Sequence, residues 1–235
     1  REQRRPGNRL REPRELVAGF HRFGENRVRA GVQVHLRPAH RVLEYDRQLA
    51  ALAERFEPAT EDGLAAFFAT GRWPGRRPGV IVALYNGARS NVDVMRPLLE
   101  RHGLLGWYFL ATAWVGCPVG EQRAFAAARA LSVVPGEYPD GRVALSWDEA
   151  RGLAAAGHVI ASHTRHHVRA TGEALRVELL GAQEDIARET GRPARSLAWL
   201  GGAAFGEDGE ADAAALAAGH EFLFSNVRVQ RLPRA

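Results

Sequence analysis

The sequence predicts an α/β fold in which short strands and helices alternate along the chain. Continuous apolar runs, such as residues 80–84, are typical of strands that a parallel sheet buries on both faces. Between these runs, apolar residues recur at intervals of three and four, as they do on one face of a helix. A chain of 235 residues with 46% hydrophobic residues can also bury one sizeable core. These observations favour parallel β/α units, arranged as a barrel or as an open sheet.

Each element follows from a local pattern. The predicted strands are short apolar runs, and they cover residues 16–20, 80–84, 107–111, 158–160, 196–200 and 221–224. The predicted helices lie between them, and they cover residues 42–56, 64–68, 90–103, 122–131, 146–157, 175–191 and 210–218. Ser90 with Asp93 and Ser146 with Glu149 have the spacing of a capping box. Residues 115–142 are otherwise poorly patterned and are interpreted as an insertion over one face of the fold.

The charged residues are unevenly distributed. All 32 basic residues are Arg, so chemistry that needs a Schiff-base lysine is excluded. Much of the net charge of +5 comes from residues 1–14, which are predicted to be a disordered Arg-rich leader before a single domain at 15–235. The leader has no interleaved aromatic residues and no recognition motif, so a nucleic-acid partner is not expected.

The cysteine content and the hydropathy of the sequence bear on the cellular location of the protein. A single cysteine, Cys117, excludes an intramolecular disulfide framework. No apolar run is long enough to span a bilayer, and no signal-peptide core is present. A cytoplasmic location is therefore expected from the chain as given, and a secreted or envelope location if a leader has been removed.

Histidines gather just past the strand predicted at 158–160. Chemistry in α/β folds is often located where a strand ends in a polar loop, and His163, His166 and His167 lie at such a place. His163 and His167 are four residues apart. If Thr164 begins a helical turn, both imidazoles lie on one face and can hold one cation.

Five segments in order resemble the polysaccharide deacetylase family, whose members are metal-dependent N-deacetylases. His163-Thr-Arg-His-His167 matches the family's His-Ser/Thr-x-x-His motif. The other matching segments are residues 21–24, 78–91, 145–158 and 191–202, and the chain closes at 231–234 as many members do. The resemblance covers residues 15–235 and implies a distorted parallel (β/α) barrel. It also implies a divalent metal, zinc first and cobalt or nickel as alternatives, and a carbohydrate or other small-molecule substrate.

The sequence departs from the family where the family places its acids. The first Asp of the family is the general base and the second binds the metal, but this chain has Tyr85 and Asn86 there. The resemblance therefore implies His163, His167 and Asn86 as metal ligands. The backbone N–H near the oxyanion falls at Gly201, and no late Leu-x-His segment supplies the family's general acid.

These replacements change the expected chemistry. A Tyr with a pKa near 10 is protonated at neutral pH, so Tyr85 donates a hydrogen bond where a carboxylate would accept a proton. Tyr85 is interpreted either as a donor to a substrate oxygen or as a plug in the pocket. Asn86 offers a carbonyl oxygen without charge, which weakens a cation site.

Three further residues are predicted to contact substrate. They are His21, Trp199 and His166, although His21 and Trp199 also fit structural roles. The leading hypothesis is a divergent, metal-dependent hydrolase of an N-acylated sugar or small amide with weakened or altered activity. The alternative is a catalytically inactive pseudoenzyme that binds carbohydrate or acts as a scaffold.

Overall fold

The computed structural model describes residues 18–19, 31–35, 42–200, 204–225 and 228–233. The predicted leader at 1–14 lies outside these residues, as do His21 and Gly201. The division into a leader and a single domain therefore stays a prediction.

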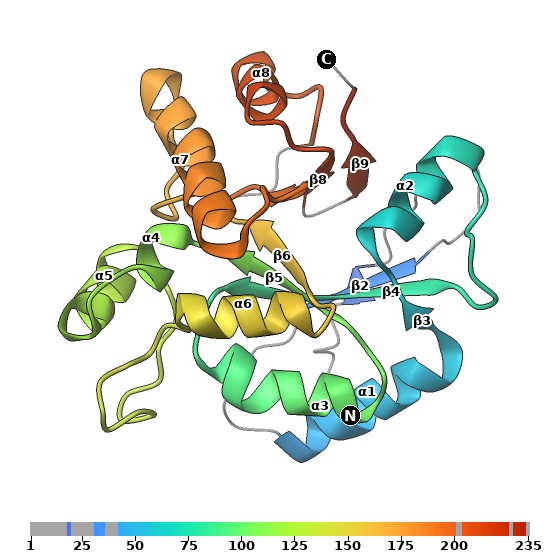
Figure 1. Cartoon of the computed structure of the whole chain (residues 1–235), viewed down its shortest axis with the longest axis horizontal. Helices are drawn as coiled ribbons and strands as arrows, with labels where there is room; N and C mark the ends of the chain where they lie inside the picture. Colours follow the sequence, from blue (N-terminus) through green and yellow to red (C-terminus); the bar gives the residue numbers. More distant parts are fainter. Residues whose placement is uncertain (1–17, 20–30, 36–41, 201–203, 226–227, 234–235) are drawn as a thin grey trace, which may run out of the picture.

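Strands and helices alternate through the described chain, as the sequence predicts (Figure 1). The strands are β1 Ala18–Gly19, β2 Gly31–His35, β3 Glu57–Pro58, β4 Gly79–Asn86, β5 Gly106–Leu110, β6 Val159–Ser162, β7 Ser196–Ala198, β8 Phe222–Phe224 and β9 Val229–Arg231. The α-helices are α1 Val42–Arg55, α2 Glu61–Thr70, α3 Arg96–Arg101, α4 Thr112–Val115, α5 Gln122–Ala128, α6 Trp147–Ala155, α7 Gly172–Thr190 and α8 Gly209–Ala217. A π-helix η1, Asn91–Met95, precedes α3, and a 3-10 turn η2, Val119–Glu121, precedes α5.

The strands form one curved sheet. Its order is β1-β2-β4-β5-β6-β7-β8-β9, and β3 pairs with the first residues of β4. Pairing is parallel from β2 to β8, while the outermost pairs, β1 with β2 and β8 with β9, are antiparallel. In the described part of the chain no pairing joins β1 to β9. The predicted parallel barrel is thus confirmed in a distorted form that stays open.

Alternate residues of the central strands face opposite sides of the sheet, as the two-residue period of a strand requires. On the concave side, one apolar cluster gathers residues of β4 to β9, including Ile81, Ala83, Trp107 and Phe109. Leu64 and Phe67 of α2 belong to the same cluster, and Trp107 Nε1 donates to the carbonyl of Ala59 just before α2. Helix α2 therefore closes the amino ends of the strands and leaves their carboxyl ends for a site.

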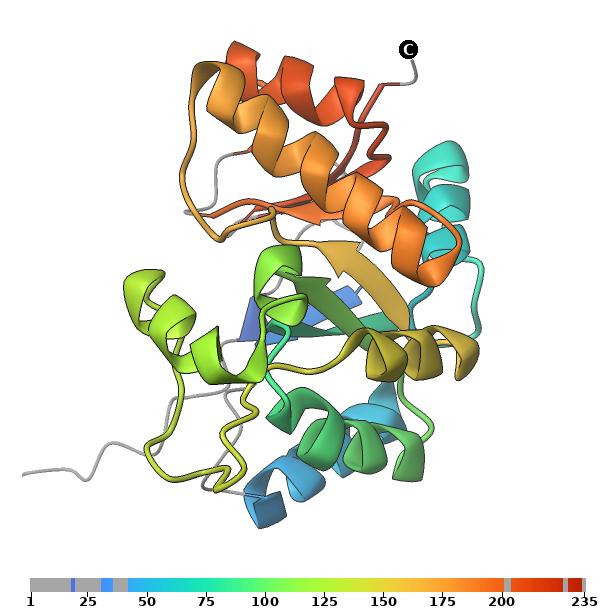
Figure 2. The ribbon, with the colours of Figure 1, turned by 60° about the vertical axis from the view of Figure 1, so that its left-hand side comes forward.

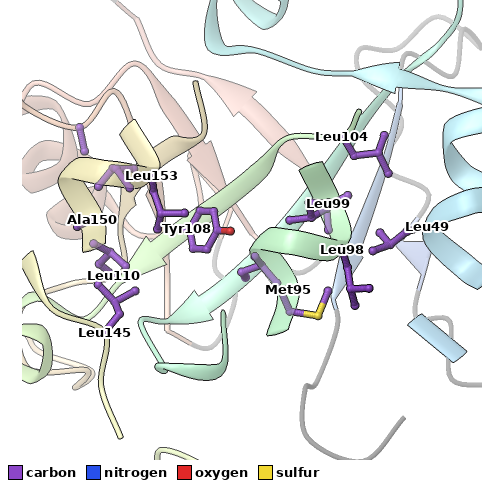
Figure 3. Packing of buried hydrophobic residues seen from close by; sticks show 14 of the residues in the cluster. Leu49, Met95, Leu98, Leu99, Leu104, Tyr108, Leu110, Leu145, Ala150 and Leu153 are labelled. Carbon is purple, nitrogen blue, oxygen red and sulfur yellow. The ribbon is translucent and has the colours of Figure 1, made fainter. Parts of the chain in front are cut away.

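The convex side is covered by helices (Figure 2). The intervening residues Val80, Val82 and Leu84 of β4 pack with α1, η1, α3 and α6. Figure 3 shows Tyr108 of β5 enclosed by the apolar side chains of these helices. Helices α7 and α8 pack together over β7 and β8, with Leu197 and Leu223 beneath them. Burial on both faces explains why these strands read as continuous apolar runs.

Several local predictions are wrong. The sequence pattern does not predict β2, β3 or β9. Ser90 does not cap a helix, because it already has helical dihedral angles and its side chain makes no capping bond. Asp93 instead forms an ion pair with Arg89. The Ser146–Glu149 capping box is confirmed, with both reciprocal hydrogen bonds present.

The segment 115–142 is better ordered than its sequence suggests. Gln122 joins its ends, because its side-chain oxygen accepts from the backbone N–H groups of Val143 and Ala144. Trp114 is buried in a small apolar cluster with Ala126 and Leu131, and its Nε1 donates to the carbonyl of Gln122. This packing fixes the end of α5 beside residues 163–168, the histidine loop.

Candidate functional site

The two histidines of the His163–His167 motif lie side by side. Their ring centroids are 5.1 Å apart, and the rings meet edge to face at an interplanar angle of 65°. His163 directly follows β6, and its Nδ1 lies 2.8 Å from the carbonyl oxygen of Ala198 at the end of β7. His167 Nδ1 lies 3.0 Å from the carbonyl oxygen of Arg129, the residue after α5. Each ring is therefore held by a separate neighbouring element.

These contacts assign the chemistry of both rings. A carbonyl oxygen only accepts, so Nδ1 carries the hydrogen in each imidazole and the lone pair of a neutral ring belongs to Nε2. Burial lowers the pKa of His167 below its ordinary value of 6.5, which keeps this ring neutral at pH 7. Imidazoles that bind metals commonly donate their second N–H to a backbone carbonyl in this way. In each ring, Nε2 is thus the nitrogen of the kind that a divalent cation binds.

The backbone of the loop is not the helical turn that the sequence led us to expect. Residues 163–168 form no helix, and Thr164 and His167 have φ angles of +66° and +55°. The other non-glycine residues with positive φ in the described chain are Asn86 at +71° and Ala130 at +52°. Left-handed backbone is unfavourable for a β-branched residue such as Thr164. Such conformations cluster at functional sites, where surrounding contacts hold them in place.

Tyr85 lies against the imidazole pair. It continues the concave side of β4 after Ile81 and Ala83, and its ring stacks on Phe109 with centroids 5.0 Å apart. The same ring meets His163 edge to face, again at 5.0 Å. The side chain of Tyr85 therefore contacts His163 directly. This contact is compatible both with a phenol that donates to substrate and with a phenol that fills the pocket.

Asn86 is the last residue of β4 and follows Tyr85 directly. It pairs with Leu110 of β5, whose carbonyl in turn accepts from the backbone N–H of His163. Its side-chain oxygen Oδ1 is buried and has no hydrogen-bond partner among the described residues. A buried polar atom without a partner is unfavourable unless a ligand or water satisfies it. Asn86 therefore remains a candidate ligand at the same rim as the histidines.

The remaining predicted residues have other surroundings. The Nδ1 atom of His166 lies 2.7 Å from Glu178 Oε1, so this ring is directed to α7. Trp199 packs in the convex cluster of α7 and α8, while its neighbour Ala198 belongs to the concave cluster. The indole Nε1 of Trp199 is buried without a partner. Nothing in the structure tests a substrate contact by these two residues, which stays a prediction.

Three residues that support the site were not predicted from the sequence. Glu178 and Asp185 of α7 and Thr112 of α4 are all buried and hydrogen-bonded to the histidine loop or to each other. A signal was present for the two acids. They lie within the apolar stripe of α7, beside Leu179 and Ile186, where an unpaired carboxylate would be unfavourable.

The donor set fits a divalent cation in part. Two imidazoles with fixed Nδ1 atoms and one orphaned amide oxygen match the nitrogen and oxygen ligands that zinc accepts. Among the described residues, however, no group of three or more His, Cys, Asp or Glu side chains is placed to hold a metal. His163, His167 and Asn86 would therefore hold the cation without an anionic ligand, which predicts a weak site.

A curved parallel sheet with its polar residues at the carboxyl ends of the strands defines a β/α-barrel protein. The family model of the polysaccharide deacetylases matches residues 82–222, so the chain belongs to the polysaccharide deacetylase family. No curated protein matches the sequence. In the described chain, no helix combines the length and the apolar character needed to cross a membrane.

Solved structures of deacetylases share the fold. The Streptococcus pyogenes deacetylase PplD aligns with a TM-score of 0.60 at 10% identity, over 81% of this chain and 79% of its own. A de-N-acetylase from Aggregatibacter actinomycetemcomitans aligns at 0.59 with 14% identity, over 83% and 86% of the two chains. The deacetylase domain of BpsB from Bordetella bronchiseptica aligns at 0.57 with 17% identity, over 92% and 89%. At these identities the likeness shows the fold alone.

Proposed function

We propose that this chain binds an N-acylated carbohydrate or a similar small amide at the carboxyl rim of its sheet, beside a divalent cation held by His163 and His167. The observation that carries the proposal is the imidazole pair, with centroids 5.1 Å apart and each Nδ1 engaged by a backbone carbonyl. Family membership supplies the class of substrate. Zinc is the proposed cation, with cobalt or nickel as alternatives.

The chain's own residues define what the site can do. A bound divalent cation would supply polarisation of a carbonyl or activation of water. Tyr85, which contacts His163, would donate a hydrogen bond to a substrate oxygen. Asn86 would bind the cation, or orient a water molecule, through its carbonyl oxygen. Since neither residue is a base at neutral pH, hydrolysis is expected to be slow.

A second function has one specific observation in its favour. The Tyr85 ring packs on both Phe109 and His163, so it fills space next to the cation ligands. If that ring blocks the approach of water, the chain is a pseudoenzyme that binds carbohydrate without hydrolysing it. Binding of chitooligosaccharide without release of acetate distinguishes this function from slow hydrolysis.

The cation site is tested by titration of the metal-free protein with Co²⁺, followed by its visible absorption and by calorimetry. The wild type is expected to bind one Co²⁺ per chain. His163→Ala and His167→Ala are each expected to weaken binding by at least about 10-fold, because each removes one of two nitrogen ligands. His102→Gln is the matched control, since His102 pairs with Asp46 through Nε2.

Equal Co²⁺ affinity in the wild type and in both alanine variants would contradict the proposed site. If the His102→Gln variant also loses Co²⁺ binding, the loss is not specific to His163 and His167, and the proposed site is contradicted as well.

A further inference from the structure

One face of α7 contacts the histidine loop. Glu178, Gly181 and Asp185 are spaced by three and four residues, so they lie on one side of the helix. This side faces residues 163–168, because Arg165 and His166 donate hydrogen bonds to its acids. Helix α4 borders the same loop through the Ala113 N–H, and Figure 1 shows α4 beside α7. Both carboxyl groups are buried, each residue with 5% of its surface exposed. Buried carboxylates of this kind are stable only where donors surround them.

Glu178 accepts three hydrogen bonds from two consecutive residues, Arg165 and His166. Its Oε2 accepts from the backbone N–H groups of Arg165 at 3.0 Å and His166 at 2.7 Å. Its Oε1 lies 2.7 Å from His166 Nδ1, which donates because a carboxylate accepts. These two residues stand between His163 and His167, so the carboxylate of Glu178 fixes the backbone that spaces the two rings.

Asp185 anchors the same loop through a side chain. Its Oδ2 accepts from Thr112 Oγ1 at 2.8 Å and from Arg165 Nε at 3.1 Å. Gly181 leaves room for this contact, because a Cβ there would lie 2.8 Å from Arg165 Cδ. The backbone of α4 adds a further link, since Ala113 N–H donates to the carbonyl of Arg165 at 2.9 Å. The loop is thus held from α7 and from α4 together.

We infer that Glu178 and Asp185 are positioning residues, whose carboxylates hold the left-handed backbone of Thr164 and His167 and thereby bring the two imidazoles together. The loop needs such support because it contains two non-glycine residues with positive φ angles, +66° and +55°. Neither acid touches the ring of His163 or His167 in any contact described above. The consequence for cation binding rests on the proposed function, whereas the effect on the loop does not.

Two readouts test this inference on the full chain. The first is the nuclear Overhauser effect between the ring protons of His163 and His167 in metal-free protein with labelled histidine. The second is the Co²⁺ titration described above. Glu178→Ala is expected to abolish the ring-to-ring effect and to weaken Co²⁺ binding by about 10–100-fold, the usual loss when a residue that orients metal ligands is removed.

Two control variants and a second test variant accompany Glu178→Ala. Glu178→Gln keeps an oxygen that accepts from both backbone N–H groups, so it is expected to retain the ring-to-ring effect. Glu184→Gln changes an exposed acid of the same helix and is expected to alter neither readout. Arg165→Ala removes the link to Asp185 without altering α7, and it is expected to weaken both readouts. This last variant decides the question if Glu178→Ala fails to fold.

The outcomes separate the two claims. If the folded Glu178→Ala and Arg165→Ala variants keep the ring-to-ring effect of the wild type, the inference is overturned, whatever Co²⁺ does. If the effect is lost in these variants but the wild type binds no Co²⁺, the positioning role stands and the proposed cation site fails. Absence of the effect in the wild type would also overturn the inference.

Discussion

Placing carboxylates at the end of β4, with Tyr85→Asp and Asn86→Asp together, is expected to raise the release of acetate from chitooligosaccharides by about 10²–10⁴-fold, the usual contribution of a positioned general base. Tyr85 contacts the ring of His163, so a carboxylate there would lie next to the proposed cation ligands. Asp tolerates the left-handed backbone that Asn86 adopts, with φ at +71°. The measurement is acetate release by purified protein supplied with Zn²⁺.

Single substitutions separate the contributions of the two positions. Asn86→Asp alone is expected to tighten Zn²⁺ binding, because it adds an anionic ligand, with little gain in rate. Tyr85→Phe removes the phenol hydroxyl but keeps the ring, so it lowers residual activity if the hydroxyl donates to substrate and leaves it unchanged if the ring is a plug. A correctly folded double variant that binds Zn²⁺ tightly and still releases no acetate would show that the site lacks more than these two carboxylates.

Acidification is expected to destabilise the fold through His220. This imidazole is buried, with 4% of the residue exposed, and burial lowers its pKa from 6.5 to about 4. Both amide hydrogens of Gln183 are already donated to the carbonyls of Ala194 and Ala218. His220 Nδ1 therefore donates to the Ala194 carbonyl at 3.2 Å, and the buried lone pair of Nε2 has no partner in the part of the chain that the structure describes. A proton added at Nε2 would be a buried charge with no acceptor.

The sign of the effect follows from linkage. Because the folded pKa lies below the unfolded one, the unfolded state takes up the proton first as pH falls. The stability associated with neutral His220 is thus complete above pH 6.5 and is lost progressively toward pH 4. At pH 5 the loss amounts to about 2 kcal/mol in the free energy of unfolding, given 1.36 kcal/mol per pKa unit.

Urea unfolding at pH 7.5 and pH 5 measures this loss. His220→Asn removes the titrating group and retains an amide that can donate to Ala194, so the pH dependence of its unfolding free energy should be smaller by about 2 kcal/mol. The comparison uses the change with pH, because the variant also loses ring packing. His158 and His167, whose pKa values burial also lowers, contribute equally to both proteins. The same pH dependence in both proteins would rule out His220 as the sensitive group.

The elements that the sequence predicts well are those with a strong local pattern. The apolar run at 80–84 predicts β4 because that strand is covered on both faces. The stripe that begins at Val42 predicts α1, and the Ser146–Glu149 box predicts the start of α6. The strands β2 and β9 escape prediction because each depends on its neighbour in the sheet, β4 for one and β8 for the other.

In the site, too, features that depend on distant contacts are not predicted from the local sequence. The spacing of His163 and His167 predicts that the rings are neighbours, but for the wrong reason, since a left-handed loop rather than a helical turn brings them together. That conformation is stabilised by Glu178, which lies 11 or more residues further along the chain. Contacts of this range leave no periodic trace in the sequence. The only local hint is an acid placed in an apolar stripe.

Anomalous diffraction from crystals grown with Zn²⁺, measured above and below the zinc edge, tests whether His163 and His167 jointly hold a divalent cation. We expect one strong peak at the carboxyl rim of the sheet, within coordination distance of the Nε2 atoms of both rings. A rim without a peak, or a peak that engages only one of the two rings, would contradict it.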